Sequence, residues 1–118
     1  MRIHFVHKRS KHPNAIPLLF CHTWPSSFLE AEKVIDALTD PDEVTGYGAG
    51  APMAFHVVVP SIPGFGFSDA AGSEDFGVEE TAKAFDTVMG RLGYVCDVYS
   101  MMTFGSTVLS KIANGVLT

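Results

Sequence analysis

Cysteine, basic residues and long apolar runs are all scarce in this sequence, and each shortage excludes a class of protein. The two cysteines, Cys21 and Cys96, are too few and too far apart for a disulfide framework or a zinc site, which favours a reducing, cytoplasmic location. Eight Lys and Arg against 13 Asp and Glu leave a net charge of −5, which argues against nucleic-acid binding. No apolar run approaches the roughly 20 residues of a membrane span, and no signal-peptide pattern follows Met1.

Apolar side chains, by contrast, are abundant. They make up 47% of the 118 residues, with 18% charged, and this composition excludes a disordered chain. A chain of this length forms one small domain and buries roughly two-thirds of its extended surface. We therefore expect one domain with a hydrophobic core and without internal repeats.

Four short apolar runs predict β-strands. The runs are Ile3–His7, Ile16–Cys21, Phe55–Ile62 and Val95–Met102. The second and third are almost continuously apolar rather than alternating, which is typical of parallel strands covered on both faces.

Segments of helical period separate these runs. Ser27–Glu30 has the spacing of a capping box and opens a predicted helix that ends at Asp40-Pro41. A second helix is predicted over Val78–Leu92, with Gly93 as its C-terminal stop, and a third near Gly105. Strands that alternate with helices indicate an α/β sheet.

Candidate chemistry lies after the predicted strands, where α/β sheets place their ligand sites. His22-Thr23-Trp24-Pro25 follows the second strand, Pro60–Asp69 the third and Met101–Ser106 the fourth. Each has a structural alternative: a tight turn with Trp24 in the core, a Gly/Pro turn, and a strand-to-helix junction. His22 is predicted to be a structural hydrogen-bonding residue rather than a general base.

The same segments carry a family resemblance. Ile3-His4-Phe5-Val6-His7, His22-Thr23-Trp24-Pro25 and Pro60–Ser68 together resemble the microsomal-type epoxide hydrolases, which have the α/β-hydrolase fold. In that family an Asp attacks the epoxide to form an ester, two lid tyrosines bind the oxygen, and a His–acid pair activates the water that releases a diol. The resemblance implies a small apolar epoxide as the family's substrate and no cofactor.

Carried over by position, the resemblance assigns roles to six residues. His22 and Pro25 belong to the family's His-Gly-x-Pro turn, in which the N–H of Trp24 is one oxyanion donor. The family's nucleophile turn, Gly-Gly-Asp-Trp-Gly, aligns on Met101–Gly105. Phe104 then supplies the second oxyanion N–H, Gly105 keeps the small residue that the turn needs, and Thr103 stands at the nucleophile position.

Three features predict that the chain is inactive by itself. Thr103 replaces the Asp nucleophile, and Met101 stands where the tight turn needs a small residue. None of the five histidines lies where the family's base is found, near its C-terminus. His4 and His7 fall on opposite strand faces, so no shared metal ion is expected either.

The resemblance also implies an architecture. Residues 1–118 are expected to form a partial α/β-hydrolase domain of about four strands, without the lid and the C-terminal catalytic half. The expected strand order is Ile3–His7, Phe55–Ile62, Ile16–Cys21, Val95–Met102, with the first antiparallel to the rest, and the exposed edge of the last strand predicts self-association. The alternatives are a non-catalytic partner of a full-length homologue and a truncated gene product without its own function.

Overall fold

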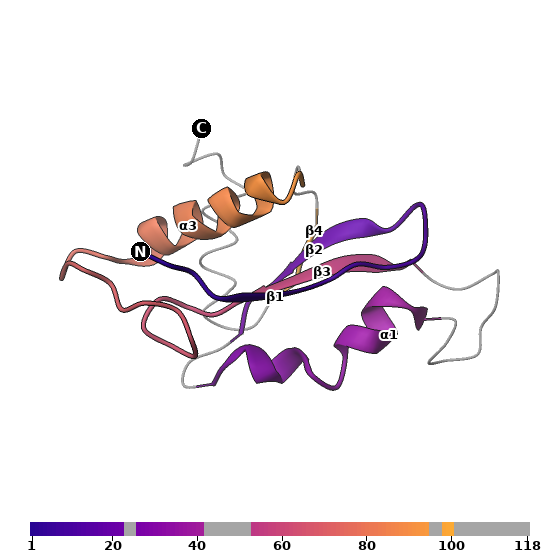
Figure 1. The fold of residues 1–118 in the computed structure, drawn as a ribbon, viewed down its shortest axis with the longest axis horizontal. Coiled ribbons are helices and arrows are strands. Elements are labelled where there is room, and N and C mark those ends of the chain that lie inside the picture. Colours follow the sequence, from indigo (N-terminus) through magenta and orange to yellow (C-terminus); the bar gives the residue numbers. More distant parts are fainter. Residues whose placement is uncertain (23–25, 42–52, 95–97, 101–118) are drawn as a thin grey trace.

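The fold is a four-stranded sheet with helices on both faces (Figure 1). The computed structural model describes residues 1–22, 26–41, 53–94 and 98–100. In chain order the elements are β1 (Phe5–Lys8), β2 (Ile16–Phe20), the 3₁₀ helix η1 (Phe28–Ala31), α1 (Ile35–Thr39), β3 (Phe55–Pro60), α3 (Val78–Arg91) and β4 (Val98–Ser100).

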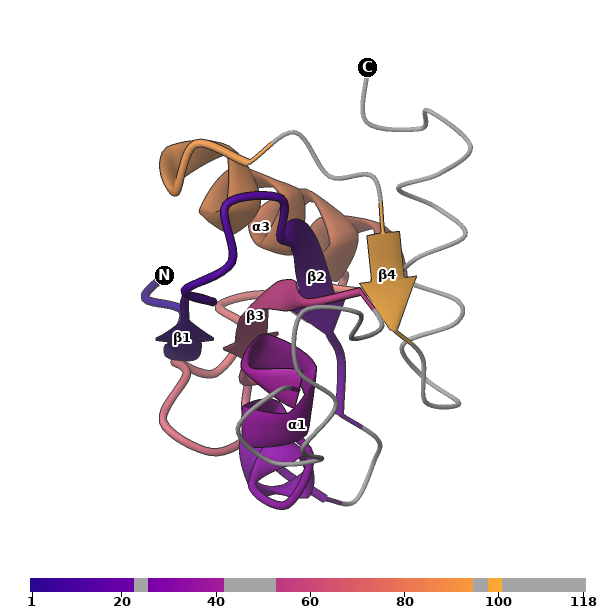
Figure 2. The same cartoon turned by 90° about the vertical axis from the view of Figure 1, so that its right-hand side faces the viewer.

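The strand order is β1-β3-β2-β4, as the family resemblance predicts (Figure 2). β1 pairs antiparallel with β3, with Val6 opposite Val59. β2 runs parallel to both β3 and β4, with Leu18 opposite Val57 and Val98. The parallel strands are joined by helical crossovers, the connection that parallel pairing requires.

The two faces of the sheet carry separate hydrophobic layers, because neighbouring residues on a strand point to opposite sides. α3 covers one face and η1 with α1 covers the other (Figure 1). The α3 layer contains Leu19, Cys21, Val58, Ile62, Ala82, Phe85 and Met89. The α1 layer contains Leu18, Phe20, Ala31, Val57 and Val59. Burial on both faces explains the almost continuous apolar runs of β2 and β3.

α3 forms where its sequence pattern predicts a helix. Glu80 caps its start, because its Oε2 accepts a hydrogen bond from the N–H of Gly77 at 3.0 Å. The apolar stripe turns inward, with Phe85 fully buried and Met89 only 1% exposed. The helix ends at Arg91, and Gly93, the predicted stop, has a φ of +85° that favours glycine.

The segment after Ser27 differs from the single helix predicted there. It forms η1 and then α1, with i→i+3 hydrogen bonds from Glu30 to Ser27 and from Val34 to Ala31. The Ser27 side chain accepts the N–H of Leu29 at 3.3 Å, not that of Glu30 as a capping box requires. The adjacent β-branched Val34 and Ile35 also disfavour a continuous α-helix, so helical periodicity here marks the buried face rather than one helix.

The described strands are shorter than the predicted runs, and two predictions fall outside the described residues. β3 ends at Pro60. The amide of Ser61 still donates to the carbonyl of His4, just before β1, whereas the amide of Ile62 donates to a side chain. The ends of the fourth run and the helix expected near Gly105 lie outside the described residues. Among the helices that are described, none is long and apolar enough to cross a membrane.

Candidate active site

The parallel strands β2 and β3 end at the same edge of the sheet, the edge where α/β folds bind their ligands. β2 continues into Cys21 and His22, and β3 continues into Ser61 and Ile62. All four side chains are buried, and His22 and Ser61 have no exposed surface. The edge is therefore a packed layer from which the loop 63–69 starts.

His22 joins the ends of the two strands. Its Nε2 accepts a hydrogen bond from the N–H of Ile62 at 3.0 Å, and its ring lies edge-on to Phe65 with 6.3 Å between ring centroids. Because Nε2 is the acceptor, the proton of the neutral imidazole is on Nδ1. This is a structural hydrogen bond of the kind predicted for His22, and it makes Nε2 unavailable as a base.

Two glycines with positive φ shape the loop that follows β3. Gly64 has φ +85° and Gly66 has φ +53°. A Cβ on Gly66 would lie 2.8 Å from Oγ of Ser61, whereas a Cβ on Gly64 would meet nothing within 4 Å. The N–H of Gly64 closes the loop by donating to the carbonyl of Asp69 at 2.9 Å. The Pro-Gly-Phe-Gly-Phe-Ser motif thus has a backbone explanation that does not require a bound phosphate.

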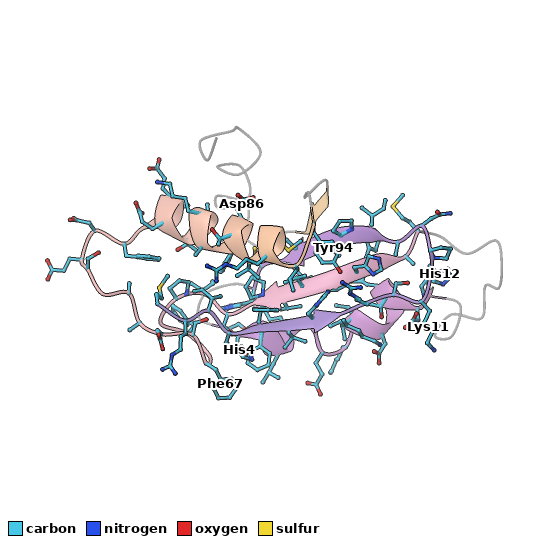
Figure 3. All side chains as sticks on the ribbon, turned by 45° about the horizontal axis from the view of Figure 1, so that its top comes forward. His4, Lys11, His12, Phe67, Asp86 and Tyr94 are labelled. Atoms are coloured by element: carbon cyan, nitrogen blue, oxygen red, sulfur yellow. The ribbon has the colours of Figure 1, made fainter. Side chains whose placement is uncertain are left out.

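A histidine outside the predicted site holds this loop against the start of the chain (Figure 3). Nδ1 of His4 lies 2.8 Å from Oγ of Ser61. The N–H of His4 donates to Oγ of Ser68 at 3.0 Å, and that hydroxyl donates to the carbonyl of Ser61 at 2.7 Å. The His4 ring also packs edge-on against Phe28 and Phe67, at centroid distances of 4.8 and 5.2 Å.

No sequence pattern predicts this role for His4, which belongs to the first resemblance motif and is expected not to share a metal ion with His7. The sequence signal that bears on the position of His4 is strand alternation, which predicts that His4 and His7 lie on opposite faces of the sheet. The structure confirms that separation, because His4 packs on Phe28 of the η1 face while Nε2 of His7 lies 2.9 Å from the hydroxyl of Tyr94, next to α3. The partner of His4 comes from residue 61, and no local pattern identifies it.

Arg2 fastens the far end of the loop. Its backbone N–H and its guanidinium both donate to the carboxylate of Asp69, at 2.8 Å and at 3.2–3.3 Å. These hydrogen bonds, that of the backbone first, hold the pKa of Asp69 below its ordinary value. The pair is exposed to solvent, so its role is to pin the loop rather than to perform chemistry.

Cys21 is a buried free thiol, as predicted. Burial raises its pKa to about 12. The thiolate is the nucleophilic form of cysteine, and at neutral pH Cys21 is not in that form. Cys96, for which the same prediction was made, lies outside the described residues.

Next to this edge, the α1 face carries an apolar groove of about 180 Å³. It is lined by Val6, Phe28, Leu29, Ala31, Glu32, Ile35 and Val59. With Glu32 as the one charged side chain among its seven lining residues, the groove suits apolar groups. Within the described ranges, no group of three or more His, Cys, Asp or Glu side chains is placed to hold a metal ion.

Of the six residues assigned by resemblance, the described part of the chain contains one, His22. Trp24 and Pro25 lie in the segment 23–25, and Thr103, Phe104 and Gly105 lie in the segment 101–118. The oxyanion hole and the nucleophile position therefore stay predictions. The structure shows the edge of the sheet at which both segments begin. β2 leads toward the segment 23–25 and the parallel strand β4 leads into the segment 101–118.

Comparison with known proteins identifies relatives over nearly the whole chain. The family model for the epoxide hydrolase N terminus matches residues 1–31. Epoxide hydrolase 1 of Sus scrofa is 42% identical over 115 residues, covering 94% of this chain and 25% of the relative. Juvenile hormone epoxide hydrolase 1 of Ctenocephalides felis is 35% identical over 114 residues, covering 94% of this chain and 23% of the relative.

Solved structures agree with these sequence matches. The crystal structure of juvenile hormone epoxide hydrolase from the silkworm Bombyx mori superimposes with a TM-score of 0.83 at 32% identity, over 98% of this chain and 26% of that one. The chain thus spans about a quarter of the length of the relatives it matches. The sequence matches and the shared sheet show that the chain belongs to the epoxide hydrolase family and has part of the α/β-hydrolase fold.

Proposed function

We propose that this chain forms the first part of an epoxide hydrolase catalytic domain and that, by itself, it does not hydrolyse epoxides. The reaction proposed for a complete site of this family converts an epoxide and water into a vicinal diol through an ester on Asp. Small apolar epoxides are the substrate class. The proposal of inactivity rests on Thr103, which by resemblance takes the position of the Asp that must form the ester.

A threonine hydroxyl needs an adjacent base before it can act as a nucleophile. Four histidines form structural hydrogen bonds: His4 with Ser61, His7 with Tyr94, His22 with Ile62 and His56 with Ser10. The remaining histidine, His12, donates its backbone N–H to Oγ of Ser10 at 3.0 Å and also has a further interaction. These contacts support the proposal that no histidine of this chain activates Thr103.

The part of the site that we assign to this chain is the oxyanion hole. Its donors are the N–H groups of Trp24 and Phe104, with Gly105 leaving room for the turn. The hydrogen bond from Ile62 to His22 supports this assignment, because it holds the side chain of the residue that immediately precedes the segment 23–25. In a complete site, these donors would stabilise the charge on the ester oxygen during hydrolysis.

The experiment measures diol formation from styrene oxide and from trans-stilbene oxide by chromatography, with buffer as the blank. We expect the wild-type chain to match the blank, since loss of a nucleophile alone costs on the order of 10⁶ in kcat in a dismantled hydrolase. Turnover that disappears in Thr103→Ala would contradict the proposal.

Thr103→Asp tests how complete the remaining pocket is. We expect this variant to be inactive too, because we assign no histidine of this chain as the base that releases the ester. Mass spectrometry of the intact protein after incubation with styrene oxide then distinguishes two cases. An unmodified mass agrees with the proposal, whereas a trapped ester on the new carboxylate would show a pocket formed well enough to bind and open the epoxide.

We also propose that the chain self-associates through the edge of β4 and is located in the cytoplasm. Among the described strands β4 pairs with β2 alone, and an unpaired edge is a template for a second chain.

The proposed location has a separate argument. The buried free thiol of Cys21 supports a reducing compartment. Fractionation of cells that express the tagged chain tests its location, and a membrane-pelleted chain would contradict it.

A further inference from the structure

A line of hydrogen bonds connects the start of the chain to His22, and every donor in it points the same way. The N–H of His4 donates to Oγ of Ser68 at 3.0 Å. The Ser68 hydroxyl donates to the carbonyl of Ser61 at 2.7 Å. On the other side of the same peptide group, the N–H of Ile62 donates to Nε2 of His22 at 3.0 Å.

We propose that Ser68 is a positioning residue whose hydroxyl, acting through the peptide group between Ser61 and Ile62, orients His22 and holds its proton on Nδ1. The peptide group is planar, so its carbonyl and its N–H move as one unit. A hydroxyl that fixes the carbonyl therefore also fixes the direction in which the N–H points. The acceptor nitrogen of His22 follows that direction.

The polarity of the line strengthens the effect. Hydrogen bonds in a chain with all donors aligned polarise one another, so each bond strengthens the next, most of all where water is excluded. His22 and Ser61 have no exposed surface, and Ile62 is 6% exposed. A carbonyl that accepts the Ser68 hydroxyl makes the N–H of Ile62 a stronger donor, which favours the lone pair rather than the proton on Nε2 of His22.

The hydroxyl is held in place from two directions, which distinguishes it from a surface serine. It accepts from the N–H of His4 at 3.0 Å and donates to the carbonyl of Ser61 at 2.7 Å. The imidazole of His4 also lies 2.8 Å from Oγ of Ser61. Gly66 passes directly over Ser61, where a Cβ would come within 2.8 Å of that Oγ. The loop thus brings Ser68 back onto Ser61 only because Gly66 leaves room for the crossing.

This inference depends on the proposed function only in treating the residues after His22 as part of the site. Its test does not measure turnover. The inference about Ser68 can therefore fail while the proposed function stands, and the proposed function can fail while the inference stands.

The experiment compares three serine variants by NMR and hydrogen exchange. Ser68→Ala removes the hydroxyl, Ser68→Thr keeps it, and Ser73→Ala is a matched control at an exposed serine. In Ser68→Ala we expect the amide of Ile62 to exchange at least about tenfold faster while the core amides of β3 (Val57–Val59) keep their wild-type protection. Imidazole ¹⁵N shifts should show a mixture of His22 tautomers in Ser68→Ala and the Nδ1–H form in the other proteins.

Three outcomes would overturn the proposal. The first is an Ile62 amide and a His22 tautomer in Ser68→Ala that are unchanged from wild type. The second is faster exchange to the same extent at Ile62 and in β3, which would mean a loss of global stability only. The third outcome concerns the wild-type chain and applies even if Ser68→Ala does not fold. We expect a ¹⁵N–¹⁵N coupling across the hydrogen bond between Ile62 and His22. Absence of this coupling, together with an Nε2–H tautomer of His22, would exclude the arrangement.

Discussion

Gly66 crosses Ser61 so closely that a Cβ on Gly66 would lie 2.8 Å from the Ser61 Oγ. Gly66 also has positive φ, so two separate requirements meet at one residue. Gly64, two residues earlier, has positive φ but open space around it. The pair therefore separates the energetic effect of backbone conformation from that of close approach.

Alanine at these two positions should destabilise the chain to different degrees. Gly64→Ala is expected to lower the free energy of unfolding by about 1–2 kcal/mol, the cost of a left-handed conformation with a Cβ. Gly66→Ala should cost a further 1–3 kcal/mol or so, because the methyl group overpacks against Ser61. Urea unfolding followed by circular dichroism measures both, with Gly72→Ala as the control, because that glycine has neither constraint. Equal losses for Gly64→Ala and Gly66→Ala would contradict the close approach.

The stability of the chain should depend more on Phe85, in the α3 layer, than on the exposed Phe67. Phe85 is fully buried, whereas Phe67 is 75% exposed. Phe85→Ala is expected to cost about 3–5 kcal/mol through lost burial and the cavity left behind, a large part of the 5–15 kcal/mol or so that stabilises a whole domain. Phe67→Ala should cost about 1 kcal/mol or less, since only ring contacts are lost. Thermal melts compare the two, and similar melting temperatures would be inconsistent with the packing of α3.

Acid should weaken the contacts around Tyr94, which sits above the sheet near His7 and His56 (Figure 3). Burial first, and then the charge of Arg9, lower the pKa of both histidines from the ordinary value of 6.5. Nδ1 of His56 also accepts the N–H of Ser10 at 3.0 Å, a bond that a protonated ring cannot accept.

The sign of this effect follows from proton binding in the two states. Because the folded pKa lies below the unfolded one, the unfolded chain binds more protons as the pH falls through 6.5, and stability falls with it until the folded pKa is passed. Urea unfolding at pH 7.5 and 5.5 should therefore show lower stability at the acidic pH, with a smaller difference in a His7→Phe/His56→Phe double variant. An unchanged difference in that variant would assign the acid sensitivity to other groups.

Self-association through β4 should depend on protein concentration. The stretch 95–104 has one charged residue, Asp97, and no proline, a composition that favours edge pairing. Light scattering after size exclusion is expected to give a mass above 12.7 kDa that rises with concentration. Tyr99→Lys on β4 should lower that mass, because a lysine on an edge strand opposes pairing. Phe5→Lys on β1, the opposite edge, is the control. A monodisperse monomer with a cooperative melt would contradict the proposed association.

The sequence by itself determines the layered part of this fold. Continuous apolar runs require strands with both faces covered, and β2 and β3 have that burial. The stripe ending at Gly93 determines α3, since helical period and a positive-φ stop are both local properties. Together with the resemblance of its motifs, this is enough to predict the strand order β1-β3-β2-β4.

Only the tertiary structure decides which distant groups share a hydrogen bond. The donor to Nε2 of His22 is an amide 40 residues away, and His4 meets Ser61 across 57 residues. Such contacts depend on where loops cross, and the crossing of Gly66 over Ser61 follows from the complete path of the chain. The division of the segment after Ser27 into η1 and α1 is also not visible in the hydrophobic periodicity, which records only which face is buried.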